Sequence, residues 1–426
     1  MIVEDPVRRG KGYNERILNG GMNVEQLPAP RGRTHNGSRH GACHGRVAIR
    51  PSRRPQSMRR GCRTPLFTQV PPALRTLEQS FPCLEEDDVR IAIAHNLRVT
   101  DDAEETVFTA RETVEYLTSS IARAGHAAIT LEVSGPVESI LRGLREHDPD
   151  LVFNIAEGWA DSGRQSFYTA LFARLGLPYT GSGPLVQALL VNKHLTKLVA
   201  REHGVRTPGW RLVTEPRDPD LSGLRFPVIV KPNSEGTSAG ITQKSVVANP
   251  AEAISHAFEL LAQYTGGVLI EEYIAGRELT VPYLAAVDNE FGGVLEPTEI
   301  VLDADAERAY NILDYGFKNY RRLPVSTSAP RVEFQTPARL PDGVARQARE
   351  TTRAVVHALG CLDIARVDYR LGADGLLYLL EANALPGLEP GLSIHRAAQL
   401  AGLDPQDGVV HAVIASAARR YRLEAL

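Results

Sequence analysis

The first regular pattern of hydrophobic and polar residues along the chain begins near residue 89. A short apolar run over 91–95 suits a buried strand, and apolar residues then recur at helical spacing over 114–124 until Gly125 supplies a stop. The pattern repeats with a strand over 128–133, a helix over 137–146 and a strand over 151–156. This strand–helix alternation predicts a parallel sheet with helices on its faces.

Polar residues follow the third predicted strand. Asn154, Glu157 and Gly158 come at its carboxyl end, which is the edge where open α/β sheets bind ligands. Ordinary loop residues after a strand are the alternative interpretation. The chain is then broken at 181–184, where a Gly-Ser-Gly-Pro sequence indicates a domain boundary.

The next segment carries lysines and a loop of small residues. Two helices are predicted, the second of which is capped by Asn192 and carries Lys193 and Lys197. A strand over 226–231 then enters a Ser- and Gly-rich loop with Lys231 at its entrance. The loop lacks the Walker spacing, but its backbone N–H groups can approach an anion closely. A flexible surface turn is the alternative.

Acidic residues interrupt two strands that are otherwise apolar. Glu271 and Glu272 lie in a strand predicted over 268–274, and Glu278 lies in the next. A buried carboxylate is costly unless it meets donors. A purine amino group or ribose hydroxyls would serve, and a salt bridge is the alternative.

Two strands joined by an Asp-Gly pair at 374–375 are the clearest candidate for a metal site. That pair favours a two-residue hairpin turn, which would set Asp368 opposite Glu381 and Arg366 opposite Asn383. Facing Cβ atoms lie about 4.5–5.5 Å apart, so two facing carboxylates need a cation between them. Oxygen ligands without His or Cys suit Mg²⁺ that keeps waters and binds phosphate. A polar face neutralised by arginines is the alternative.

Charge is distributed unevenly along the 426 residues. Residues 1–75 hold 15 Lys or Arg and 4 Asp or Glu, without apolar periodicity, so they cannot bury enough surface to offset chain entropy. A basic arm can bind nucleic acid, but aromatic residues do not interleave the arginines as base stacking would require. A passive, disordered extension is therefore favoured.

Composition excludes several classes of protein. The four cysteines form no CxxC pair, which argues against a disulfide framework and a cysteine-built zinc site. No apolar run is long enough for a spanning helix or a secretory signal. Only six of the 48 basic residues are Lys, so each lysine in the folded region is a candidate for a specific role.

Taken together, these motifs resemble the ATP-grasp superfamily and within it the D-alanine–D-alanine ligase family, over roughly residues 89–420. The resemblance rests on 153–158, the Lys193 helix, Lys231 with its loop, 271–274 with 276–278, Lys318, 366–368 and 381–387. It implies an α/β protein: an ATP-grasp fold with an N-terminal Rossmann-like parallel-sheet domain, preceded by a disordered basic tail.

The resemblance also implies roles for individual residues. The implied ATP-binding residues are Lys193, Lys231, Glu235, Gly236, Thr237, Ser238, Glu271, Ile274 and Glu278. The implied ligands of Mg²⁺ or Mn²⁺ are Asp368, Glu381 and Asn383. Arg366 and Lys318 are the implied catalytic residues, and Asn154, Glu157, Gly387 and Ser393 the implied substrate-binding residues.

The activity that follows is an ATP-dependent carboxylate–amine ligase that joins amino acids. A carboxylate is a poor electrophile at neutral pH, so one of its oxygens must first become a phosphate leaving group, which ATP supplies. The acyl phosphate must then meet an amine before water, so closing loops are expected. The alternative hypothesis is a catalytically idle nucleotide-binding regulatory protein with a nucleic-acid-binding basic arm.

Four segments are predicted: a disordered Arg-rich tail (1–88), an N-terminal α/β domain (89–182), a central ATP-grasp lobe (183–274) and a C-terminal ATP-grasp lobe with the metal site (275–426). Small amino-acid or peptide substrates are the expected partners, in the cytoplasm. A membrane and nucleic acid are not expected, and a homodimer is implied by the resemblance alone. The identity and chirality of the substrates stay open.

The chain departs from the family pattern in three places. His95-Asn96-Leu97-Arg98 replaces a double-glycine turn, so the usual substrate-contacting Glu has only Glu104 and Glu105 as nearby options. Asn192 stands where many relatives have Asp, and Asn319 stands where dipeptide-forming relatives have Tyr. The altered first loop and Asn319 predict an amine substrate that is larger or differently charged than D-alanine. A one-residue slip that lets Tyr320 fill the place of the aromatic is the alternative.

Overall fold

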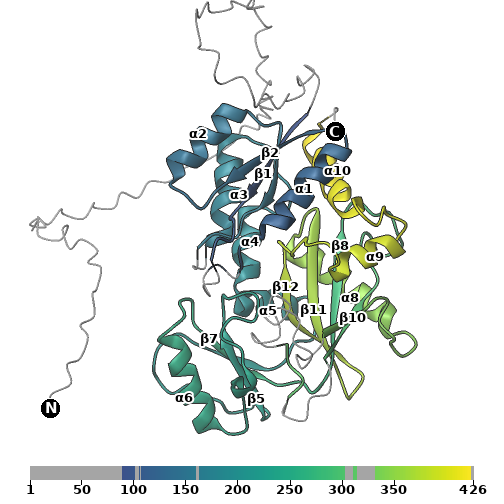
Figure 1. Ribbon diagram of the computed structural model, residues 1–426. Coiled ribbons are helices and arrows are strands. Elements are labelled where there is room, and N and C mark those ends of the chain that lie inside the picture. Colours follow the sequence, from purple (N-terminus) through teal and green to yellow (C-terminus); the bar gives the residue numbers. More distant parts are fainter. Residues whose placement is uncertain are drawn as a thin grey trace, which may run out of the picture. The chain divides into compact units, whose positions relative to one another are not determined.

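Three β-sheets and their helices make up the part of the chain that the computed structural model describes, residues 89–100, 105, 107–159, 163–302, 310–313 and 332–423 (Figure 1). The predicted tail, 1–88, lies outside the described residues. The strands are β1 (Arg90–His95), β2 (Ala127–Glu132), β3 (Leu151–Ile155), β4 (Trp210–Val213), β5 (Val228–Pro232), β6 (Val246–Val247), β7 (Val268–Glu272), β8 (Gly276–Leu284), β9 (Thr298–Leu302), β10 (Val332–Gln335), β11 (Ile364–Gly372) and β12 (Leu377–Asn383). The α-helices are α1 (Arg111–Arg123), α2 (Val137–His147), α3 (Arg164–Leu175), α4 (Pro184–Val191), α5 (Lys193–Glu202), α6 (Pro250–Leu261), α8 (Val344–Leu359), α9 (Ser393–Leu400) and α10 (Gly408–Tyr421).

The N-terminal sheet has the order β2-β1-β3, and both pairings are parallel. This confirms the predicted strand–helix alternation. Ile91 and Ile93 point into a core shared with α1, whereas Ala92 and Ala94 point into a core shared with α2 and α3. Both faces are therefore buried, as expected for a parallel sheet.

Two antiparallel sheets form the rest of the fold. One has the order β4-β7-β5-β6 and is covered by α6, whose N-cap residue Asn249 accepts from the Glu252 N–H at 3.0 Å. The other has the order β10-β9-β8-β11-β12 and packs against α8. None of the described helices combines the length and apolarity needed to cross a bilayer.

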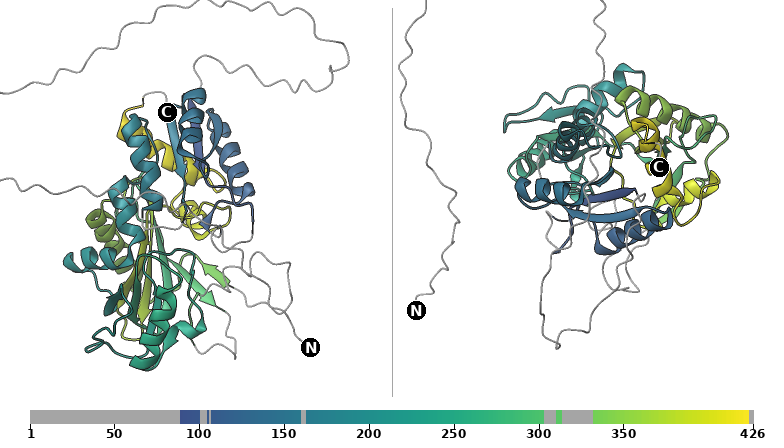
Figure 2. Two further views of the ribbon diagram at one scale, coloured as in Figure 1. Left: turned by 90° about the vertical axis from the view of Figure 1, so that its left-hand side faces the viewer. Right: turned by 90° about the horizontal axis from the view of Figure 1, so that it is seen from above.

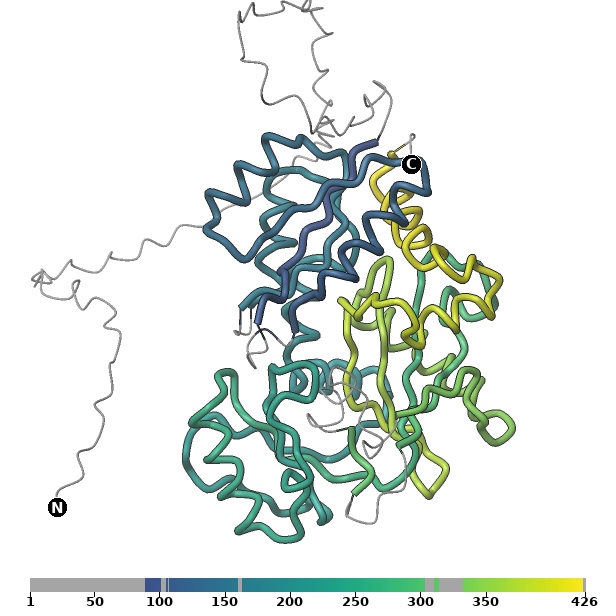
Figure 3. Tube along the Cα trace, in the orientation of Figure 1, coloured from purple at the N-terminus to yellow at the C-terminus, as the bar shows by residue number. Residues whose placement is uncertain are grey.

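Helices from distant parts of the chain complete the cores of other segments. Leu190 of α4 and Ala200 of α5 join the core of the five-stranded sheet, and α9 and α10 join the core of the N-terminal sheet. Figures 1 and 2 show the yellow C-terminal helices beside the blue N-terminal domain, and Figure 3 traces the chain through α4 and α5 into the four-stranded sheet. Segments on either side of the predicted domain boundaries pack into the same cores, so the cores do not mark these boundaries. The boundaries therefore remain a prediction.

A buried carboxylate at Asp363 ties three of these segments together. It accepts hydrogen bonds from the Gly181 N–H at 2.8 Å and the Ser416 hydroxyl at 2.7 Å, and it pairs with Arg420 at 2.6 Å. Asp363 is 2% exposed, with a positive φ of 58°. The linker before α4, the start of β11 and α10 are therefore fixed by one side chain.

We expect Arg420→Ala to lower the free energy of unfolding by about 3 kcal/mol, because it leaves the Asp363 carboxylate buried without its cation. The matched control is Arg346→Ala, which removes an exposed 3.2 Å ion pair with Glu290. That change should cost less than about 1 kcal/mol. Urea unfolding of the whole protein measures both, and equal losses would contradict the role given to Asp363.

Candidate active site

The predicted pairing of carboxylates across the C-terminal hairpin is confirmed. Asp368 of β11 lies opposite Glu381 of β12, and Arg366 lies opposite Asn383. The Asp368 side chain is 12% exposed and that of Glu381 34%, so both are only partly screened by solvent. The pair therefore needs nearby positive charge.

The predicted turn of this hairpin is wrong. Gly372 donates to the Leu376 carbonyl at 2.9 Å, so the loop holds three residues, and Gly375 takes the left-handed φ of 74° that such a loop requires. The register then shifts between Asp368 and Tyr369, at a β-bulge. The bulge restores the predicted pairing, because its extra residue cancels the longer loop.

Cations lie against both carboxylates. Arg366 Nη2 is 2.9 Å from Asp368 Oδ2 and 4.0 Å from Glu381 Oε1, and Lys193 Nζ is 3.3 Å from Glu381 Oε2. Burial alone would lower the pKa of Arg366, but the carboxylates of Asp368 and Glu381 raise it above its ordinary value. Arg366 is therefore a permanent positive charge beside this pair.

The donor set suits a hard divalent cation. Asp368, Glu381 and Asn383 offer only oxygen, and the Asn383 side-chain oxygen accepts the Leu385 N–H at 2.8 Å, which orients the amide. The described residues contain no group of three His, Cys, Asp or Glu that could hold an ion by themselves. Two carboxylates and an amide fit Mg²⁺ or Mn²⁺ when waters and phosphate oxygens complete the coordination.

A second charged cluster is almost completely buried. Glu271 is 1% exposed and lies 3.2 Å from Lys231 Nζ and 3.0 Å from Lys197 Nζ. Lys197 also donates to the Leu379 carbonyl of β12 at 3.2 Å. The cluster thus joins β5, β7 and α5 to the strand that carries Glu381. Ile274, implied to hold adenine with Glu271, lies partly buried after β7.

The other two acids of these strands form salt bridges. Glu272 pairs with Arg225 at 2.8 Å, so for this residue the alternative interpretation, a salt bridge, is confirmed. Glu278 pairs with Arg370 at 3.1 Å, and its side chain is 15% exposed. Glu278 nevertheless lies on the β8 strand that pairs directly with β11, beside the candidate metal site.

The loop after β5 contacts the metal side of the site. The Lys193 ammonium donates to the Glu235 carbonyl, and the Ser238 hydroxyl donates to the Leu313 carbonyl at 2.7 Å. Thr237 and Ser238 both have positive φ, 49° and 59°, beside Gly236. Two consecutive non-glycine residues in this region store strain of the kind found at ligand clamps.

At the N-terminal sheet, Asn96 shapes the turn that follows β3. Its side-chain oxygen accepts the N–H groups of Glu157 and Gly158, both at 2.9 Å. Gly158 has a φ of 73°, and an added Cβ would meet the Arg164 backbone at 3.0 Å. Sequence reasoning missed Asn96, although its signal was the departure from the double-glycine turn at this place.

The residues implied to bind substrate are divided between two places. Glu157 accepts a 2.6 Å hydrogen bond from Gln165, and burial raises its pKa above the ordinary value. Asn154 is 3% exposed, and its side-chain N–H group has no partner in the described part of the chain. Gly387 is itself exposed in the loop after β12, and Ser393 is buried at the start of α9.

Four residues named from the sequence lie outside the described part of the chain, and a fifth, Glu105, has a structural role in its own loop. The four are Lys318, Glu104, Asn319 and Tyr320. Glu105 accepts the N–H groups of Val99 and Thr100 at 2.8 and 2.7 Å, so its carboxylate orders its own loop. It is therefore not a free substitute for the Glu of relatives.

Of two further charged residues, Lys197 was named from the sequence without a role, and Arg164 was missed. Lys197 lies one helical turn after Lys193, so helical spacing combined with the scarcity of lysine was a usable signal. Arg164 pairs with Glu235 at 3.2 Å, but in a chain rich in arginine nothing distinguished it.

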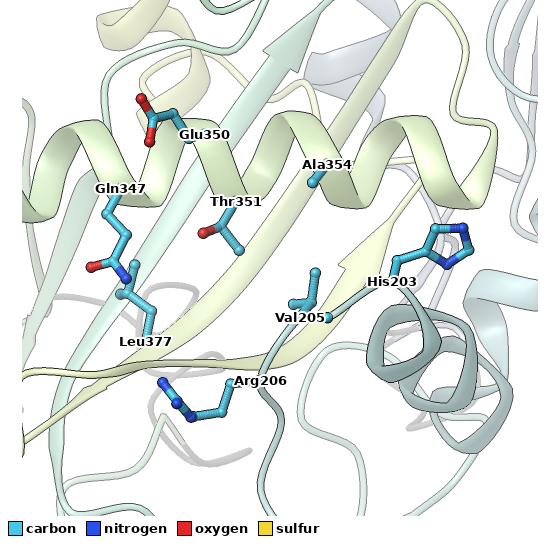
Figure 4. A pocket seen from close by; sticks show the side chains of 9 residues that line it. His203, Val205, Arg206, Gln347, Glu350, Thr351, Ala354 and Leu377 are labelled. Atoms are coloured by element: carbon cyan, nitrogen blue, oxygen red, sulfur yellow. The ribbon is translucent and has the colours of Figure 1, made fainter.

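A separate cavity of about 360 Å³ lies between α8 and the segment after α5 (Figure 4). Its lining includes His203, Arg206, Gln347, Glu350 and Leu377. It contains none of the predicted site residues. It is therefore distinct from the site described above.

Comparison with known proteins identifies the family. Residues 204–415 match the family described as D-ala D-ala ligase C-terminus. The chain is 32% identical to D-alanine–D-alanine ligase B of Chromobacterium violaceum, over 64% of this chain and 82% of that protein. It is 30% identical to the uncharacterized protein y4sG of Sinorhizobium fredii, over 71% of this chain and 86% of that protein.

The fold is also that of solved ligases. The structure of D-alanine–D-alanine ligase from Bacillus anthracis complexed with ATP matches with a TM-score of 0.60 at 22% identity, over 79% of this chain and 99% of that chain. These similarities favour the ligase hypothesis over the idle regulatory protein. The chain therefore belongs to the D-alanine–D-alanine ligase family, and it is an ATP-dependent ligase with the ATP-grasp fold.

Proposed function

We propose that this ligase activates the carboxylate of one amino acid with ATP and joins it to the amine of a second amino acid or a short peptide. The observation that carries the proposal is the contact of Lys193 with both Glu381 and Glu235. Through it, the candidate metal site, a lysine suited to phosphate and the strained loop come together. Such a group serves phosphoryl transfer, where positioning and charge stabilisation supply most of the catalysis.

In this proposal, Mg²⁺ held by Asp368, Glu381 and Asn383 would neutralise charge on the nucleotide phosphates. Lys193 and Lys231 bind phosphate oxygens, and the loop residues Glu235, Gly236, Thr237 and Ser238 cover them. Glu271 and Ile274 hold the adenine, and Glu278 holds the ribose. Arg366 stabilises the charge that develops on the acyl phosphate and on the tetrahedral intermediate. Lys318 is proposed to close over the transferred phosphoryl group.

The substrate side is proposed from Asn154, Glu157, Gly387 and Ser393. Buried polar groups reject poorly matched substrates more strongly than an apolar pocket rejects one methylene. The changed turn at Asn96 and the Asn at 319 therefore favour an amine substrate larger or differently charged than D-alanine. The cytoplasm, where ATP is available, is the proposed location, and a homodimer remains a prediction.

Lys197 is proposed to orient Glu271 for the nucleotide base. Burial lowers the pKa of Lys197 to about 8, although the Glu271 carboxylate opposes this shift. Because the folded pKa lies below the ordinary value of 10.5, ionised Lys197 opposes folding below pH 8. This penalty is relieved as the pH rises from about 8 to 10.5.

We expect Glu381→Gln to lower kcat/KM for amino-acid-stimulated phosphate release by at least about 100-fold. This loss should exceed the one caused by mutating a residue that only hydrogen-bonds a metal ligand, because Glu381 is proposed to bind the metal itself. Phosphate release from ATP with Mg²⁺ is measured across D- and L-amino acids and short peptides. The control is Glu350→Gln on the exposed face of α8, which should leave turnover unchanged. Bound ATP without stimulation by any amino acid or peptide would contradict the proposed function.

Titration of Lys197 tests the electrostatics of the nucleotide side. We expect its ¹³Cε signal to titrate with a midpoint near 8, since burial disfavours the ammonium. The chain has only six lysines, so the signal is assigned by its absence from Lys197→Arg. A midpoint at or above 10.5 would show that Glu271 fully compensates the burial.

A further inference from the structure

Arg164 connects the N-terminal sheet to the loop of the nucleotide side. It is the first residue of α3, it is 6% exposed, and its Nη1 lies 3.2 Å from Glu235 Oε2. Glu235 in turn accepts from Lys193 through its carbonyl. A buried guanidinium thus lies where the substrate half and the nucleotide half of the site meet.

One edge of this guanidinium is unused. Arg164 Nε is buried and has no hydrogen-bond partner in the described part of the chain. Four other arginines, Arg123, Arg225, Arg277 and Arg366, bind carboxylates through the edge formed by Nε and Nη2. Arg349 and Arg420 bind theirs through a terminal nitrogen and leave Nε unpaired, as Arg164 does. In Arg164 the Glu235 carboxylate binds Nη1 and leaves the edge formed by Nε and Nη2 open.

The neighbouring groups do not fill the open edge. The nearby Glu157 carboxylate already accepts a hydrogen bond from Gln165 at 2.6 Å. Gly236 has no side chain to fill the edge, and a Cβ atom added to it would still lie 3.7 Å from Arg164 Nη2. The Asn154 side-chain N–H group is a second buried donor without a described partner at this sheet edge. Buried donors left unpaired are costly, so the open Nε of Arg164 indicates a ligand with acceptor oxygens.

We propose that the Nε–Nη2 edge of Arg164 binds a carboxylate of the substrate while Nη1 holds Glu235. The ligand class is therefore an amino acid or peptide that keeps a free carboxylate, and the inference rests on the proposed function for the identity of that substrate. A planar carboxylate matches the guanidinium fork with two parallel hydrogen bonds.

The bound carboxylate belongs to the amine substrate. A carboxylate held at both oxygens by a buried guanidinium is a weak nucleophile, so it would be a poor acceptor of the phosphoryl group of ATP. The carboxylate of the amine substrate does not react and can stay clamped through the whole reaction. Arg164 would then tie this substrate to Glu235, so that its binding favours the closed loop.

The test compares binding of amino acids and of their carboxamides, which lack the charge. Calorimetry with D-alanine, L-alanine, D-serine, glycylglycine and the corresponding amides is done in the presence of Mg²⁺ and a non-hydrolysable ATP analogue. We expect a free carboxylate to bind about 10- to 100-fold more tightly than its amide in the unaltered protein. Arg164→Gln should reduce this preference to that of the site for the activated carboxylate, and Arg164→Lys should retain part of the difference.

Two control variants separate this role from a structural one. Glu235→Gln should weaken binding of the ATP analogue but keep the preference for the carboxylate, and Arg346→Gln should change neither. Loss of the preference in Glu235→Gln would mean that Arg164 acts only through the loop, which would overturn the inference. So would an unchanged preference in Arg164→Gln, or the absence of any preference in the unaltered protein.

Failure of the carboxylate site can be distinguished from failure of the proposed ligase reaction. If no amino acid or peptide stimulates phosphate release but Arg164→Gln still reduces the preference for the carboxylate, the ligase reaction is wrong and the carboxylate site stands. If turnover occurs and its KM for the amine substrate is the same in Arg164→Gln, the ligase stands and the carboxylate site is wrong.

Discussion

Two carboxylates that face each other across a hairpin repel unless positive charge lies beside them, and the site is built around this constraint. Arg366 neutralises Asp368 from the same strand, and Lys193 reaches Glu381 from the start of α5. Because Lys193 also contacts the loop at Glu235, the position of the loop depends on the same charge. A divalent cation and a nucleotide would enter an arrangement that already balances these carboxylates.

The remaining architecture keeps these elements in register. Lys197 and Glu271 form a buried bridge between the four-stranded sheet and β12, at a place where an unpaired charge would be costly. Asp363 fixes α10 and the linker to the start of β11. Since α9 and α10 complete the core of the N-terminal sheet, that sheet cannot be removed without exposing the core.

Local patterns predicted much of the fold and part of the site. The alternation of strands and helices predicted the parallel sheet, and the Asn192 cap predicted the start of α5. The pairing of Asp368 with Glu381 was predicted correctly although the turn was not, because the bulge cancels the longer loop. Turn type is a local preference, whereas this bulge lies several residues away and leaves no local signal.

The contacts at the N-terminal sheet, where substrate binding is proposed, could not be predicted in the same way. Arg164 and Asn96 acquire their contacts through tertiary packing between segments far apart in sequence, as in the pairs Arg164–Glu235 and Asn96–Gly158. Each is an ordinary polar residue in its local sequence. Lys193 and Lys231 were singled out because lysine is rare in this chain and each lies at or near the end of a predictable element.

The most direct test of the central claim is a crystal structure of the protein with Mn²⁺ and a non-hydrolysable ATP analogue, with the metal located by its anomalous scattering. The account predicts a manganese ion bound by Asp368, Glu381 and Asn383 and by phosphate oxygens that also contact Lys193. A nucleotide bound elsewhere, or a metal without Asp368 and Glu381 among its ligands, would contradict it.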